Sequence, residues 1–370
     1  MRTWTLLGLL ACAGDSTKIN DDSVSVDDSA TTDDSAGGEE GGGEGGEGGE
    51  GGEGGEGGEG GGEGGERAEG HYFPDGAPWY QDISDAATDP DSDTMIAALQ
   101  EAGWGFGRFQ IDFSLDVLEA DASTEKVAFE PTEDFYTPDC DDVPVPLPEG
   151  GNVEGETGYA CTSDGDCHLL VANWEEDTLY EMWRANVRGD TFYGGCLAVW
   201  DMSRVYPADG RGEQCTSADA AGYPIAPLLF SADELYDDRL DHAIRFILPN
   251  SSIRDGEYYH PASHATNADG GGAEAIPYGA RLRLKPDFDL SRLDNPYAQQ
   301  VAVALQTYGM VLADGGNIAL TAQADTHTVH TWAELGFDSH SLVGIEPEDF
   351  EVLELPAAVP LTFECERNAD

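Results

Sequence analysis

The chain has 370 residues and a formal net charge of −57 at pH 7, with 74 acidic residues against 17 lysines and arginines. Nucleic-acid binding requires a basic surface, so this composition excludes nucleic acid as a partner. Acid-rich surfaces favour solubility in saline surroundings but do not identify a ligand.

The first eleven residues are predicted to be a secretory signal peptide. Arg2 precedes a short apolar run that ends at Ala11, and this run is too short to be a permanent membrane-spanning helix. Leu9-Leu10-Ala11-Cys12 resembles the lipobox of bacterial lipoproteins, in which the cysteine carries the lipid. The resemblance implies an exported lipoprotein of the cell envelope, held at the outer membrane or cell surface through lipidated Cys12. An ordinary signal peptide with an unmodified cysteine is the alternative.

Residues 12–70 are predicted to form a flexible acidic tether. An Asp/Ser/Thr-rich stretch is followed by Gly-Gly-Glu triplets between Glu39 and Glu66. Such a sequence has too little apolar surface to offset the chain entropy lost on folding. Its root-mean-square span as a Gly-rich coil is about 40 Å. Calcium binding is disfavoured, because glutamates separated by paired glycines have no fixed cage geometry.

Six further cysteines indicate a disulfide framework, which is typical of exported proteins. Fifteen pairings are possible. Proximity in sequence favours Cys161 with Cys167 and Cys196 with Cys215, which leaves Cys140 for Cys365. The cysteines show no CxxC spacing, so no metal site is predicted.

Residues 71–370 are predicted to form one β-rich domain. Helices are expected at 92–102, with Asp91 or Ser92 as cap and Gly103 after the end, and at 296–308, which starts at Pro296 and stops before Gly309. Many strands and few helices favour a β-sandwich or jelly-roll-like fold. The strands are expected at 109–117, 168–173 and 178–183 as a hairpin, 195–200, 242–248, 280–285 and 318–323.

Several segments resemble a broad group of exported bacterial proteins that has no established activity. They include DGDCHLLV (164–171), TSADAAGYPIAPLL (216–229), HAIRFILP (242–249), YGARLRLK (278–285) and YGMVLADGG (308–316). The resemblance extends over most of residues 72–350 and implies no catalytic assignment. Compared with that group, Cys196 and Cys215 are additions, which suits a local disulfide.

The rare positive charges are candidate ligand-binding groups. Arg281, Arg283 and Lys285 alternate along one expected strand and therefore share one face. They could hold an anionic sugar, or pair with the protein's own carboxylates, which is the alternative for so acidic a chain. Arg245 is a further candidate on the strand 242–248.

Histidines and carboxylates supply candidate catalytic groups. His168 and His264 could act as base or acid near neutral pH. A buried, hydrogen-bonded histidine is the alternative for His168. Glu181 and Tyr193 lie among aromatic residues that suit either a sugar ring or a sandwich core. Asp314, followed by Gly315-Gly316, predicts a hairpin turn and is also a candidate ligand-binding residue.

These features together predict a cell-surface lipoprotein that acts on or binds extracellular polysaccharide. As a lyase or hydrolase it would use His168 or His264 as base or acid, Glu181 as acidic partner, and Arg281 and Arg283 to hold uronates. The alternative is a non-catalytic structural or protein-binding surface module. The sequence lacks GxSxG, Walker and HExxH motifs and identifies no cofactor.

Overall fold

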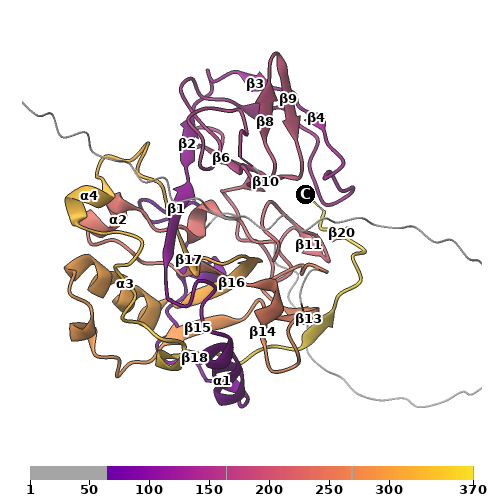
Figure 1. The fold of residues 1–370 in the computed structure, drawn as a ribbon. Coiled ribbons are helices and arrows are strands. Elements are labelled where there is room, and N and C mark those ends of the chain that lie inside the picture. The colour runs from indigo at the N-terminus through magenta and orange to yellow at the C-terminus, as the bar shows by residue number, and fades with distance from the viewer. Residues whose placement is uncertain (1–64, 164, 268–269, 370) are drawn as a thin grey trace, which may run out of the picture. The chain divides into compact units, whose positions relative to one another are not determined.

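The computed structural model describes residues 65–163, 165–267 and 270–369 (Figure 1). The expected signal peptide, Cys12 and the Gly-Gly-Glu segment up to residue 64 lie outside these ranges. Strands clearly outnumber helices, which confirms the prediction of a β-rich domain with few helices. None of the helices in the described ranges has the length and apolar character that crossing a membrane requires.

The largest sheet has six strands in the order β1-β17-β12-β16-β15-β18. Its neighbours are parallel in the pairs β1–β17 and β12–β16 and antiparallel in the others, so the sheet is mixed. The strands are β1 (Ile111–Leu115), β12 (Ile244–Leu248), β15 (Arg281–Leu284), β16 (Met310–Gly315), β17 (Leu320–Gln323) and β18 (Phe350–Val352).

A second sheet has four strands in the order β10-β7-β6-β2, with only β2 and β6 parallel. Its hairpin of β6 and β7 was predicted. The strands are β2 (Val117–Ala120), β6 (Leu169–Asn173), β7 (Thr178–Met182) and β10 (Leu197–Asp201). Smaller sheets are formed by β3 (Lys126–Val127) with β5 (Val145–Pro146), β4 (Glu130–Pro131) with β9 (Thr191–Gly194) and β8 (Asn186–Arg188), β11 (Gly212–Glu213) with β20 (Glu366–Arg367), and β14 (Ile276–Tyr278) with β13 (Ile253–Tyr259) and β19 (Ala358–Pro360).

The two longer helices begin where the sequence predicts, and they end at the predicted residue (α1) or one residue before it (α3). α1 (Ser92–Ala102) follows Asp91 and ends at Gly103, whose positive φ of 74° suits glycine. α3 (Pro296–Thr307) is capped by Asn295, whose side chain accepts from the Tyr297 amide. α1 packs against β18 and α3 against β15. The shorter helices are α2 (Ala232–Tyr236) and α4 (Trp332–Leu335), with 3₁₀ turns η1 (Pro78–Tyr80), η2 (Ala226–Leu228), η3 (Asn250–Ser252), η4 (Leu290–Arg292) and η5 (Pro347–Asp349).

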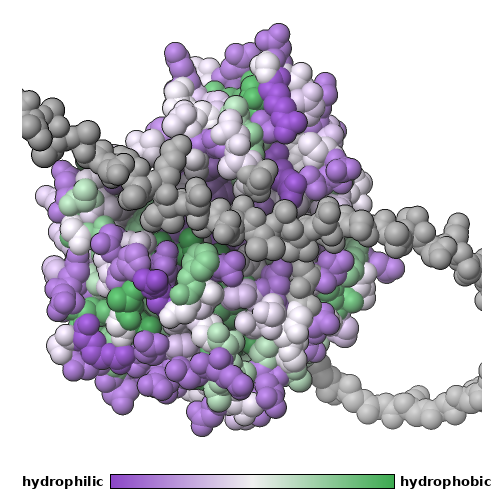
Figure 2. All heavy atoms as spheres, viewed as in Figure 1, coloured by the Kyte–Doolittle hydropathy of each residue, from purple (hydrophilic) through white to green (hydrophobic). Residues whose placement is uncertain are grey.

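Two hydrophobic clusters form the core, and the four-stranded sheet separates them. Leu170 and Ala172 of β6 belong to the larger cluster, which also contains the six-stranded sheet, whereas Leu169 and Val171 belong to the smaller one. Alternate residues of a strand point to opposite faces, so both faces of this sheet are buried. The face drawn in Figure 2 is mostly hydrophilic, and its apolar side chains form small scattered groups.

Two predictions about connections are wrong. β16 and β17 do not form a hairpin at Asp314, because β12 lies between them and pairs with both. The disulfides are Cys140–Cys196, Cys161–Cys167 and Cys215–Cys365, so only the shortest of the three predicted pairings is confirmed. Cys196 lies at the start of β10, where Cys140 approaches it, while Cys215 follows β11, which pairs with the C-terminal strand β20.

Candidate functional site

A pocket of about 720 Å³ opens at one end of the four-stranded sheet. Asp166 precedes β6, Trp183 follows β7 and Cys196 precedes β10, and the antiparallel register places these three positions at the same end. Asp314, near the carboxyl end of β16, closes the pocket from the six-stranded sheet. The volume is in the range of small-ligand sites. The other lining residues are Phe135, Tyr136, Thr137, Asp139, Thr216, Ser217, Ala218, Asp219, Ala220, His264, Thr266, Asn267 and Phe363.

Each of the three disulfides fixes a segment that lines this pocket. Cys140–Cys196 anchors the segment 135–139 to the start of β10. Cys161–Cys167 closes the short loop that carries Asp166. Cys215–Cys365 joins the segment 216–220 to the C-terminal segment that contains Phe363. The walls of the pocket are therefore covalently stapled.

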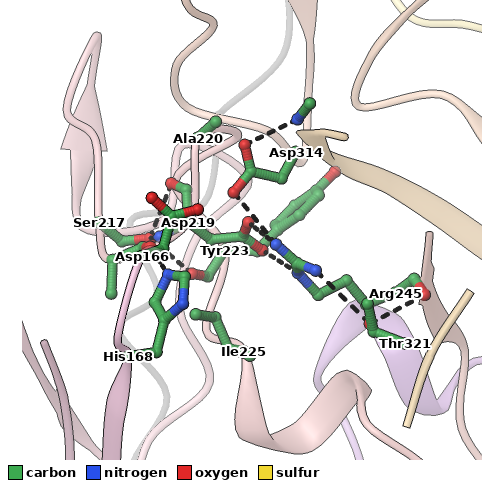
Figure 3. Close-up of polar contacts among 12 residues, drawn as sticks. Asp166, His168, Ser217, Asp219, Ala220, Tyr223, Ile225, Arg245, Asp314 and Thr321 are labelled. Atoms are coloured by element: carbon green, nitrogen blue, oxygen red, sulfur yellow. Dashed lines mark hydrogen bonds and ion pairs between the residues drawn. The ribbon is translucent and has the colours of Figure 1, made fainter. Parts of the chain in front are cut away.

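One buried arginine forms ion pairs with two carboxyl side chains at the pocket floor (Figure 3). Arg245 of β12 donates through Nε and Nη2 to Asp219, at 3.1 and 2.8 Å, and through Nη2 to Asp314 at 3.1 Å. The Asp219 side chain is fully buried, whereas that of Asp314 is 24 % exposed toward the pocket. Burial and the charge of Asp219 raise the pKa of Asp314 to about 8 although Arg245 opposes the shift. Asp314 is thus the carboxyl that holds a proton at neutral pH.

Asp166 is the exposed carboxylate of the pocket. It accepts a hydrogen bond from Trp183 Nε1 at 2.9 Å, and no cation of the described residues lies within ion-pair distance of it. The indole is itself held by the Arg184 guanidinium, 4.6 Å from the ring centroid. Figure 3 shows Asp166 beside the loop that bears Asp219. Its charge contributes to the raised pKa of Asp314, so the two carboxyls interact across the pocket.

His264 lines the pocket as a neutral imidazole. Its Nδ1 lies 2.8 Å from the Ala220 carbonyl oxygen, which can only accept, so Nδ1 carries the proton and Nε2 keeps its lone pair. Burial lowers the pKa of His264, which keeps the ring neutral at pH 7. This candidate, together with Asp314, is placed by the structure in the pocket.

His168 lies behind the pocket rather than in it. Its Nδ1 is 2.7 Å from Glu154 and its Nε2 is 3.1 Å from the Ala218 carbonyl oxygen. Burial lowers the pKa of His168, but the negative charge and hydrogen bond of Glu154 outweigh it and raise the pKa to about 9. The ring is then an imidazolium that donates from both nitrogens. It lacks the lone pair that a general base needs and instead positions the backbone next to Asp219.

The remaining candidates lie outside the pocket. Glu181 is fully buried and accepts from the amides of Ile225 and Ala226, both at 2.8 Å, so it fixes the start of η2. Tyr193 lies on β9 and does not line the pocket.

The two arginine side chains of β15 bind other groups of the protein itself. Arg281 donates to the carbonyl oxygens of Pro78, Gln81 and Tyr308. Arg283 binds Glu351 at 2.8 Å and the carbonyl oxygens of Ile83 and Ser84. Arg281 and Arg283 therefore follow the alternative of internal pairing, and their side chains are not available to hold a uronate.

Asp166, Asp139 and Asp219 are not among the site residues that the sequence predicts. The sequence does carry a signal for Asp166, namely an acid in a short loop closed by two cysteines that are six positions apart. In the described ranges, a group of three potential metal ligands occurs at Glu156, Cys161 and Cys167. Both sulfurs belong to the disulfide, so this group does not suit a metal ion.

No protein-family model matches the chain, and comparisons with curated proteins and with solved structures find no similar protein.

Proposed function

We propose that the domain binds a neutral extracellular glycan in this pocket and hydrolyses a glycosidic bond there. The observation that carries the proposal is the pair Asp314 and Asp166, two interacting carboxyls that line one pocket, where burial and the charge of Asp219 raise the pKa of Asp314 to about 8. Glycosidases use two such groups, one protonated and one ionised. Asp314 is the general acid that protonates the leaving oxygen, and Asp166 is the second carboxylate.

The walls of the pocket support a sugar as the ligand. Phe135, Tyr136, Trp183 and Phe363 offer aromatic surface for the apolar faces of sugar rings, while Thr216 and Asn267 offer groups for hydroxyl hydrogen bonds. Four carboxyl side chains line the pocket, and its described lining contains no lysine or arginine. Of these, Asp139 and Asp166 have no ion-pair partner among the described residues, and such carboxylates repel anions, so the proposed substrate is neutral and not uronic.

Arg245 orients Asp314, and His264 offers a further hydrogen-bond acceptor in the pocket. The bidentate contact of Arg245 with Asp219 leaves a single donor for Asp314, so the guanidinium orients Asp314 without removing its proton. Nε2 of His264, which has no hydrogen-bond partner among the described residues, can accept a hydrogen bond from a substrate hydroxyl.

The location of the protein is part of the same proposal. Three disulfides are compatible with an exported protein, because they persist in oxidising surroundings. Lipidation at Cys12 and display on the cell surface would bring the pocket to extracellular polysaccharide.

The test uses the full-length protein with soluble xylan, hydroxyethylcellulose, glycol chitin, laminarin and galactomannan, followed through new reducing ends. We expect one polymer to be cleaved, and Asp314→Asn and Asp166→Asn each to lower kcat by at least about 100-fold. Because the acid must be protonated, wild-type kcat should fall as the pH rises through about 8. Asp255→Asn, an exposed aspartate outside the pocket, is the matched control and should retain wild-type kcat.

Two outcomes contradict the proposal. Product formation that is unchanged in Asp314→Asn removes this residue as the acid. Binding of a polymer without any product removes catalysis and favours the non-catalytic glycan-binding module.

A further inference from the structure

We propose that Phe363 is a sugar-stacking residue at the mouth of the pocket, and that the substrate is a chain extending beyond the cleavage site. This inference deepens the proposed function and rests on it. Phe363 lines the pocket, yet 52 % of its surface is exposed. It therefore lies at the rim, where part of its side chain meets solvent. The ring centroid is 5.7 Å from that of His264, in an edge-on arrangement that joins the rim to the pocket wall.

The backbone at Phe363 is strained. Its φ is +59°, the left-handed region that bulky side chains rarely occupy. Burial of the Phe363 side chain does not offset the cost of this backbone conformation, because about half of the side chain is exposed to water. A conformation of this kind persists where surrounding contacts over-determine it, and such residues cluster at ligand-binding sites.

Those contacts come from the segment before Cys215. The side chain of Gln214 accepts from the Thr362 amide at 2.7 Å and donates to the Pro360 carbonyl oxygen at 3.0 Å. Gln214 is buried, and its backbone also lies in the left-handed region, with φ +61°. The disulfide Cys215–Cys365 clamps the other side of Phe363. The backbone that carries this exposed aromatic ring is thus held in place at the pocket.

The chemistry of the mouth identifies the occupant as a neutral pyranose chain. Tyr136 is the second half-exposed aromatic residue of the lining, at 50 %. Rigid, exposed aromatic rings stack on apolar faces, and each such contact contributes modestly to affinity. Because the mouth is continuous with a pocket rich in carboxyl and hydroxyl groups, a ring stacked here belongs to the same molecule as the ring held inside.

The variant Phe363→Asn removes the aromatic ring but is compatible with the left-handed backbone at this position. Asparagine tolerates the left-handed region, so the variant keeps the fold while it loses the aromatic surface. Phe106→Asn is the matched control, because Phe106 is 50 % exposed and does not line the pocket. Phe363→Trp restores an aromatic face.

The experiment is calorimetric titration of full-length protein in the Asp314→Asn background, which prevents cleavage. The probes are xylohexaose, cellohexaose, chitohexaose, laminarihexaose and mannohexaose, with the corresponding disaccharides. For the hexasaccharide that binds, we expect Phe363→Asn to weaken affinity about tenfold, with a loss of at most about twofold for the disaccharide. Phe363→Trp should restore hexasaccharide affinity, and Phe106→Asn should leave it unchanged.

The failures are distinguishable. Equal hexasaccharide affinity with and without the Phe363 ring overturns the stacking role and leaves the proposed function intact. If no hexasaccharide binds the parent protein, the proposed function is overturned, and the role of Phe363 falls with it.

Discussion

Replacing Arg245 by methionine should be among the most destabilising single changes in the domain. The guanidinium is 4 % exposed and is shared by the fully buried Asp219 and by Asp314. Methionine keeps much of the apolar volume but leaves Asp219 buried without its cation. Removing one partner of a buried ion pair typically costs about 3–5 kcal/mol. Small domains are stable by about 5–15 kcal/mol, so this is a large part of the total.

The assay is urea unfolding at pH 7, with Arg239→Met as the control. Arg239 pairs with Asp237 at 2.7 Å, but these side chains are 44 % and 45 % exposed, and such pairs contribute about 0–1 kcal/mol. The double variant Arg245→Met/Asp219→Asn should recover part of the lost stability, because no buried charge remains unpaired. A loss for Arg245→Met no larger than that of the control would refute the reasoning.

Two further predictions concern groups around the pocket. The pKa of His168 is raised to about 9, so its stabilising contribution is complete below pH 6.5 and is lost as the pH rises through 9. His168→Gln should lower the unfolding free energy by about 3 kcal/mol at pH 6 and by clearly less at pH 9.5, measured by urea unfolding. The Cys215–Cys365 bond closes a separation of 150 residues and Cys161–Cys167 one of 6. Loop entropy predicts losses of about 5 and about 2 kcal/mol for the respective double serine variants, in thermal or urea unfolding.

Each of these predictions has a contrary result. A loss in His168→Gln that is the same at both pH values would show that packing, not the ion pair with Glu154, sets the effect. Equal losses for the two serine variants would show that native contacts, not chain entropy, determine what each disulfide contributes.

The sequence predicts those parts of the fold that local chemistry determines. Asp91 and Gly103 delimit the helix at Ser92–Ala102 and Pro296 and Gly309 delimit the second long helix, because such start and stop signals act within a few residues. The hairpin of β6 and β7 was predicted for the same reason. Parallel pairs such as β12–β16 join distant segments, and the sequence carries no local signal for them.

The site was only partly predictable for the same physical reason. Asp314, Arg245 and His264 were singled out, and the structure places them in or beneath one pocket. Asp219, the ion-pair partner of Arg245, is 26 residues from it in sequence. Their contact depends on the packing of a loop against β12. The pairing of Cys196 with Cys215, predicted from their proximity in sequence, is wrong because long-range disulfides follow the fold and not the spacing of the cysteines.

The stapling of the pocket walls has a consequence for how this protein can diverge. Tyr136, Asn267 and Phe363 line the pocket but belong to neither hydrophobic cluster. Disulfides hold the segments of Tyr136 and Phe363 in place, so these side chains can change without repacking the interior. A lineage, or a laboratory library randomised at these positions, can therefore explore new ligand preferences on an unaltered scaffold.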